Sequence, residues 1–135
     1  MNTLSSELYW LTLSVILTAI MVTPYAVYRT KKLGGLLYVF KTPLPGDSPF
    51  DKDWAHRAYR AHMNAFEGVA LFAPLAIAVH VSGTANEVTA MASATFFWAR
   101  LVYAPLYYFP VPYLRTSVWS VGFIATLVLA YELLV

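Results

Sequence analysis

Apolar residues fall into four long runs separated by polar segments, and this pattern predicts four membrane-spanning helices. The runs cover residues 8–28, 54–81, 88–108 and 115–135. Each run reaches the ~20 residues that a helix needs to cross roughly 30 Å of hydrocarbon. No internal repeat or soluble module accompanies them. The sequence therefore predicts an all-α fold, in which residues 1–135 form a single four-transmembrane-helix bundle.

Prolines and polar residues set the predicted limits of these helices. Pro24 should kink the first helix near its end, because its ring removes a backbone hydrogen bond. The connection over residues 29–53 includes KTPLPGDSPFDKD (41–53), whose three prolines and one glycine predict irregular structure. Asp51 or Asp53 is a candidate N-cap for the second helix.

Composition makes lipid the main solvent and excludes several functions. Hydrophobic residues make up 59% of the chain and charged residues 12%, against about 25% charged in soluble domains. A net charge of +2 without a basic stripe gives no reason to expect a nucleic-acid partner. The chain has no cysteine, and its three histidines are too scattered for a metal centre. We therefore expect no metal cofactor.

The basic residues indicate how the bundle is oriented. All nine Lys and Arg lie in or beside the 29–53 connection, or in the third and fourth runs as Arg100 and Arg115. Basic loops stay in the cytoplasm, which predicts a cytoplasmic 29–53 loop and both termini on the opposite side. The first run lacks a basic leader and a small-residue cleavage site, so we expect it to remain as an anchor. A bacterial inner membrane is the expected location, with an intracellular eukaryotic membrane as the alternative.

Polar side chains recur at helical spacing in the second and third runs. Intervals of three, four and three place four of them on one face of the second helix: Arg57, Arg60, Asn64 and Glu67. The same spacing joins Arg100, Tyr103 and Tyr107 on the third helix, and Arg115 opens the fourth. Cations outnumber anions here, which suits a ligand with several carboxylates, because Arg binds carboxylates in pairs of hydrogen bonds. The alternative is structural, with Glu67 held by an Arg to fix helix packing.

Two segments resemble the MAPEG family, the membrane-associated proteins of eicosanoid and glutathione metabolism. RAYRAHMNAFE (57–67) is similar to the family's second-helix signature, and ARLVYAPLYYFPVPYLRTSVW (99–119) to its third-to-fourth helix region. The resemblance covers essentially the whole chain. It implies a homotrimer in membrane lipid, with glutathione bound as co-substrate between neighbouring subunits. Family members include glutathione transferases, peroxidases, eicosanoid synthases and a non-catalytic activator.

The resemblance also implies roles for individual residues. Arg115 matches the family Arg that stabilises the glutathione thiolate, and Thr116 stands where catalytic members often have Ser. The implied glutathione contacts are Arg57, Arg60, Asn64, Glu67, Arg100, Tyr103, Tyr107 and Trp119. Met63 departs from an Arg of some synthases, and Leu71 from the usual Pro, so a prostaglandin or leukotriene substrate is not expected.

The function implied is a membrane-bound glutathione transferase or peroxidase. It would direct the thiolate at a lipophilic small molecule, either an electrophile or a hydroperoxide, that arrives from the bilayer. The alternative is a non-catalytic scaffold that binds glutathione or lipid without turnover. A small transporter is a weaker third reading, because the sequence holds no repeat symmetry.

Overall fold

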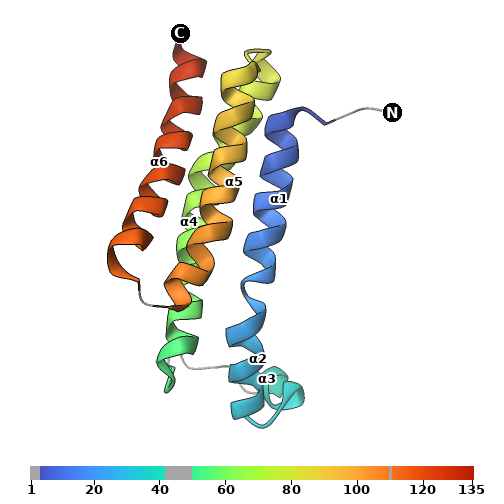
Figure 1. Ribbon diagram of the computed structural model, residues 1–135. Coiled ribbons are helices and arrows are strands. Elements are labelled where there is room, and N and C mark those ends of the chain that lie inside the picture. Colours follow the sequence, from blue (N-terminus) through green and yellow to red (C-terminus); the bar gives the residue numbers. More distant parts are fainter. Residues whose placement is uncertain (1–3, 42–49, 110) are drawn as a thin grey trace.

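Four long helical segments run side by side in a computed structural model that describes residues 4–41, 50–109 and 111–135 (Figure 1). The helices are α1 (Ser6–Ile20), α2 (Thr23–Lys32), α3 (Leu36–Lys41), α4 (Asp53–Ser82), α5 (Glu87–Tyr108) and α6 (Pro112–Leu134). The start of α1 and the end of α6 lie at the upper end in Figure 1, and α3 lies at the lower end. The predicted all-α bundle is confirmed.

Three segments of the described chain are long and apolar enough to cross a membrane. They are Ser6–Lys32, which combines α1 and α2, then Asp53–Ser82 and Pro112–Leu134. The α5 segment is less apolar because it carries Arg100 and several Tyr, Thr and Ser residues. It packs against α1, α4 and α6, so it completes the bundle as the fourth long segment.

The first predicted helix is two helices, because the helical path is interrupted at Met21 and Val22. Pro24 occupies the second position of α2, where its missing N–H is tolerated. This proline has no hydrogen to donate to the carbonyl four residues earlier, so the break just before it follows from the sequence. The predicted kink near Pro24 is confirmed, and in the structure it is an interruption between α1 and α2.

The predicted 29–53 loop is partly wrong. Helix α2 continues to Lys32, and α3 occupies Leu36–Lys41. Between them Gly34 and Gly35 have φ of 97° and 111°, a conformation that glycine adopts without steric cost. The two glycines therefore separate two helices instead of opening one long loop. Most of the segment predicted to be irregular, residues 42–49, lies outside the described residues.

Small residues allow the helices to approach closely. The buried face of α4 consists largely of alanine and glycine: Ala55, Ala58, Ala61, Ala65, Gly68 and Ala76. In lipid, helices associate through such close contact because no hydrophobic effect drives them together. Higher in the bundle, Phe72 and Phe96 stack with ring centroids 4.0 Å apart, and Leu129 of α6 is fully buried in the same cluster. This packing fixes the positions of α4, α5 and α6 relative to one another.

A polar cluster joins three helices at the upper end. Asn86 caps α5, and its side chain and that of Thr89 form a reciprocal capping box. The Thr89 hydroxyl also donates to Glu7 of α1 at 2.6 Å, and the Asn86 amide donates to Glu132 of α6 at 2.7 Å. Glu7 is 2% exposed. Sequence reasoning missed this buried carboxylate, because only the fold brings Thr89 to it.

We expect Thr89→Val to destabilise the protein by about 1–2 kcal/mol, because it leaves the buried Glu7 without its hydrogen-bond donor and removes half of the capping box. Thermal unfolding of the purified protein in detergent measures the effect. Thr95→Val is the matched control, since the exposed Thr95 hydroxyl donates only to the carbonyl of Met91 in its own helix. Equal shifts for the two variants would contradict a role for the cluster.

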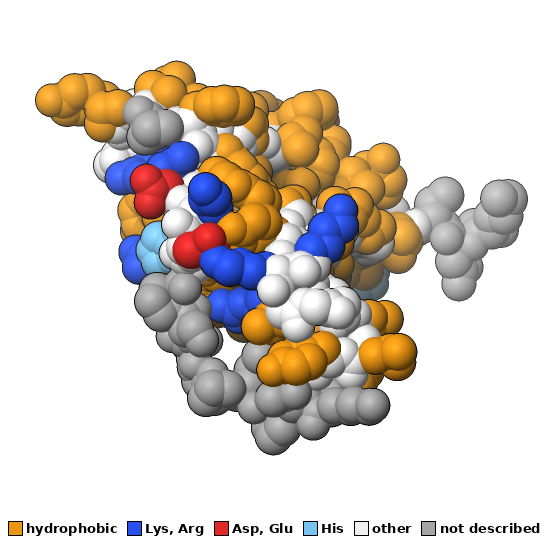
Figure 2. All heavy atoms as spheres, turned by 90° about the horizontal axis from the view of Figure 1, so that it is seen from below, with side chains coloured by type: hydrophobic (Ala, Val, Ile, Leu, Met, Phe, Trp, Pro, Cys, Tyr) orange, Lys and Arg blue, Asp and Glu red, His pale blue; other side chains and the backbone are white. Residues whose placement is uncertain are grey.

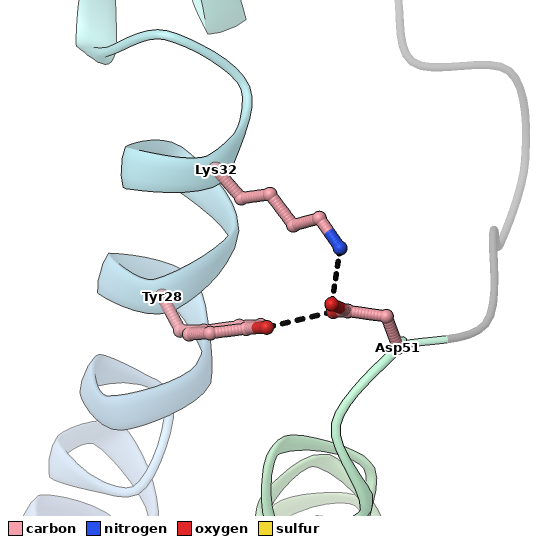
Figure 3. Close-up of polar contacts among 3 residues, drawn as sticks. All are labelled: Tyr28, Lys32 and Asp51. Atoms are coloured by element: carbon pink, nitrogen blue, oxygen red, sulfur yellow. Dashed lines mark hydrogen bonds and ion pairs between the residues drawn. The ribbon is translucent and has the colours of Figure 1, made fainter.

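Asp51 ties α2 to the start of α4 (Figure 3). Its carboxylate pairs with Lys32 and accepts a hydrogen bond from the Tyr28 hydroxyl at 2.7 Å. The predicted capping role is therefore wrong. The N-cap of α4 is Lys52 without a side-chain bond, and Asp53 is the first helical residue.

The same contacts change how the Asp51 carboxyl titrates. The hydrogen bond from Lys32, followed by the one from Tyr28, lowers the pKa of the Asp51 carboxyl below its ordinary value. A lowered pKa in the folded state means that the contact stabilises the fold above the ordinary carboxyl pKa. That contribution is lost as the pH falls through the lowered value, so the tie between α2 and α4 is intact at neutral pH.

Candidate functional site

A pocket of about 560 Å³ opens between the lower parts of α4, α5 and α6. Its lining comprises Tyr59, Arg60, Met63, Asn64 and Glu67 of α4, Tyr103 and Tyr107 of α5, and Arg115, Thr116 and Trp119 of α6. The volume falls within the roughly 300–1,000 Å³ that is usual for small-molecule sites. The antiparallel course of α5 and α6 is what brings the end of one and the start of the other to the same depth.

The structure brings together eight of the ten residues that the sequence singled out. These are Arg60, Asn64, Glu67, Tyr103, Tyr107, Arg115, Thr116 and Trp119. It adds Tyr59 and Met63, which precede Glu67 by eight and four residues and so border the polar face of α4 on one side. Their four-residue spacing from Glu67 was a signal that could have found them.

Arg57 does not line the pocket. Its Nε donates to the backbone carbonyl of Tyr108 at 3.0 Å. Tyr108 is the last residue of α5, and carbonyls at a helix C-terminus lack intrahelical donors. Arg57 therefore fixes the end of α5 against α4.

Charged groups of both signs face the pocket. Arg60 and Arg115 are the cations and Glu67 is the carboxylate. The Arg115 guanidinium lies 5.0 Å from the centre of the Tyr107 ring, in cation–π contact. Within the described residues the salt bridge is that of Lys32 with Asp51, so no Arg of the described chain forms a salt bridge with Glu67. Its carboxylate is available to a ligand.

Arg100 lies behind the pocket wall instead of in it. The side chain is 5% exposed, and its Nη1 donates to Oδ1 of Asn64 at 3.0 Å. Its Nε is buried without a hydrogen-bond partner among the described residues. The guanidinium carbon is 5.1 Å from the centre of the Phe96 ring. Because Asn64 Oδ1 accepts from Arg100, the amide NH₂ of Asn64 remains free to donate into the pocket.

Two glycines make room for this guanidinium. A Cβ added at Gly68 would lie 2.6 Å from Nη2 of Arg100, and one added at Gly122 would lie 3.5 Å from its Nε. The first distance is a severe overlap and the second is ordinary contact. Gly68 is therefore the position on α4 that lets Arg100 cross behind Asn64.

Basic side chains gather at the lower end of the bundle, which Figure 2 shows from below. They come from the end of α2, the start of α4 and the start of α6. A surface of this kind attracts anionic solutes toward the pocket at the same end.

His62 serves a contact outside the pocket. The Tyr25 hydroxyl lies 2.6 Å from Nδ1 of His62, which links α2 to the face of α4 that points away from the pocket. Among the residues that the structure describes, no group of three or more His, Asp or Glu is placed to hold a metal ion. The lining of the pocket offers guanidinium, carboxylate, amide, hydroxyl and aromatic groups.

Comparison with known proteins gives the same family as the residue pattern. No curated protein matches the chain at a significant level. Residues 8–135, nearly the whole sequence, match the family model of the MAPEG family. Together with the apolar helices, this match means that the chain is an integral membrane protein and belongs to the MAPEG family.

Proposed function

We propose that this protein is a membrane-bound glutathione transferase or peroxidase. Family membership supports a glutathione-related role in the membrane. The observation that carries the proposal is the meeting of Arg60, Asn64, Glu67 and Arg115 in one pocket of suitable volume. These side chains offer partners for one carboxylate, the ammonium and the thiol of the tripeptide.

The charges of the pocket complement those of glutathione. The ligand has two carboxylates, one ammonium and one thiol. Arg60 and Arg115 provide two guanidiniums and Glu67 one carboxylate. Glu67 would receive the ammonium, Arg60 would bind a carboxylate through paired hydrogen bonds, and the Asn64 NH₂ would donate to the peptide backbone. Because the site would carry a net positive charge, it would bind glutathione most tightly after the thiol has ionised.

Arg115 and Thr116 are the groups proposed to activate the thiol. A free thiol has a pKa near ~8.5, and the thiolate is the nucleophile. A cation about 4 Å away contributes up to ~4 kcal/mol at an effective dielectric of 20. Lowering the pKa by one unit requires ~1.4 kcal/mol. One guanidinium therefore suffices, even with partial screening by water, and the Thr116 hydroxyl would add a hydrogen bond to the sulfur.

The second substrate would be lipophilic and would arrive from the bilayer. In conjugation the thiolate donates an electron pair to an electrophilic carbon, and the leaving group departs with the electron pair of its bond. In peroxide reduction the thiolate attacks the outer oxygen of a hydroperoxide and the O–O bond breaks. This gives a sulfenic acid and an alkoxide, which takes a proton from water to become the alcohol. A second glutathione then reduces the sulfenic acid, forming glutathione disulfide and water. The location of the enzyme in the membrane brings such substrates to the site.

We also propose that the site works in a homotrimer, with the lower end of the bundle in the cytoplasm of a bacterial cell. The pocket lies at the end where Lys and Arg gather, and basic ends of membrane proteins face the cytoplasm. Glutathione is a cytosolic thiol, so this orientation would give it direct access. Two further copies of the chain would close the open side of the pocket.

Titration of the detergent-solubilised protein with glutathione at neutral pH tests the proposed function. We expect the ultraviolet absorbance of the thiolate to rise with the glutathione concentration and to reach a plateau when each site holds one glutathione. Binding without thiolate absorbance would favour a non-catalytic scaffold. Absence of binding would refute glutathione as the ligand.

A further inference from the structure

Helix α3 presents an unusual number of apolar side chains to its surroundings. Leu36 is 60% exposed, Leu37 77%, Tyr38 50% and Phe40 79%. These residues surround most of a six-residue helix, whose main packing contact is with α2. So much apolar surface in so short an element is unfavourable in water, which indicates that something beyond the described residues covers it.

The position of α3 restricts what that covering can be. The helix follows directly after the Ser6–Lys32 segment, which is apolar and long enough to cross a membrane. Gly34 and Gly35, both at positive φ, turn the chain, and α3 lies beside the lower end of α2 (Figure 1). Four Cα steps from Lys32 to Leu36 span at most ~14 Å. Helix α3 is therefore confined to the level at which α2 leaves the apolar layer.

The charges next to α3 along the chain, within residues 29–41, are all positive. Residues 29–41 contain Arg29, Lys31, Lys32 and Lys41 and no acidic residue. Lys31 and Lys32 are exposed at the end of α2. Apolar and aromatic residues flanked by lysines are the composition of helices that lie in the membrane interface. Basic residues beside such a helix are attracted to anionic lipid headgroups.

We propose that α3 is an interfacial anchor that docks on the anionic surface of the leaflet at the lower end of the bundle. Leu37 and Phe40 enter the boundary between headgroups and acyl chains, and Lys31 binds a lipid phosphate. Lys32 also holds Asp51 at the start of α4 (Figure 3). The anchor therefore connects the membrane surface to the helix that forms one wall of the pocket. The proposal is independent of which ligand the pocket binds.

Single cysteines test the proposal cleanly, because the natural chain has none. An environment-sensitive fluorophore is attached to the full-length protein at one of two sites, in the variants Phe40→Cys and Leu37→Cys. Each labelled protein is reconstituted in nanodiscs of phosphatidylcholine with phosphatidylglycerol. Lys52→Cys, at the exposed start of α4, is the control site. We expect the α3 probes to emit at shorter wavelength and to be quenched by lipids that carry a shallow spin label. We expect iodide in the water to quench them several-fold less than the control probe.

Other outcomes overturn the proposal. Iodide quenching of the α3 probes equal to that at Lys52 would place α3 in water. Protection from both iodide and spin-labelled lipid would mean that a second copy of the chain covers it instead. The attraction to anionic headgroups is tested separately. Protection from iodide should weaken in nanodiscs without phosphatidylglycerol, and also in the Lys31→Gln variant in nanodiscs that contain it. No change in either case would overturn recognition of anionic headgroups.

Discussion

Arg115→Ala should abolish the thiolate absorbance of bound glutathione and reduce turnover by at least ~10-fold, while the protein stays folded. Arg115 lines the pocket at the start of α6 and contacts the face of the Tyr107 ring in cation–π geometry. Its loss therefore removes positive charge from the pocket without opening the core. If the thiol pKa returns to its free value near ~8.5, only a few per cent of the thiol is ionised at neutral pH.

Two variants separate loss of this particular cation from general loss of charge. Arg115→Lys keeps the charge and should retain part of the thiolate signal, with a poorer fit because an ammonium lacks the planar donor pair of a guanidinium. Lys52→Ala removes a cation from the same end of the bundle and lies outside the pocket lining, so it should leave the signal unchanged. A full thiolate signal in Arg115→Ala would show that Arg115 does not activate the thiol.

Much of the site could be predicted from spacing, because helices repeat so regularly. Intervals of three and four residues assigned Arg60, Asn64 and Glu67 to one face, and the structure places all three in the pocket. Arg57 fits the same spacing but lies one turn earlier on α4, opposite the end of α5. There its guanidinium donates a hydrogen bond to the backbone carbonyl of Tyr108. Periodicity defines a face of a helix. It does not say which neighbouring element ends opposite each turn.

Arg100 shows a second limit of sequence reasoning. Its spacing placed it on one face with Tyr103 and Tyr107, and the family resemblance implied a ligand contact. In the structure its guanidinium instead donates to Asn64 from behind the pocket wall. The deciding residue is Gly68, on a different helix, whose missing side chain provides the space. A glycine inside an apolar run has no distinctive pattern, so this pairing becomes visible only once α4 and α5 are packed.

The fold was predictable where apolar runs were long and less so where segments were short. The four long segments follow from their length and composition, and the break before Pro24 follows from proline chemistry. Helix α3 escaped prediction because six residues are too few to show a periodicity, and the preceding Gly34 and Gly35 indicate a loop. Glu7 escaped because burial of a carboxylate near the N-terminus depends on Thr89, far away in the sequence.

Gly68→Ala should destabilise the protein by about 2–4 kcal/mol and weaken glutathione binding. The new Cβ would lie within 2.9 Å of three guanidinium atoms of Arg100, which are too enclosed to move aside freely. Overpacking costs about 1–3 kcal/mol, and losing the charged hydrogen bond to Asn64 adds about 1.5–3 kcal/mol. The better helix propensity of alanine offsets only ~1 kcal/mol. Thermal unfolding in detergent and glutathione titration measure the two effects.

Gly122→Ala is the matched control, because its Cβ would meet Arg100 at 3.5 Å, an ordinary contact distance. It should change stability by less than ~1 kcal/mol. A double-mutant cycle then identifies the cause. In an Arg100→Ala background the overlap no longer exists, so adding Gly68→Ala should be neutral or slightly stabilising. If Gly68→Ala is equally harmful with and without Arg100, its effect comes from helix packing, and the glycine does not serve to place Arg100 behind Asn64.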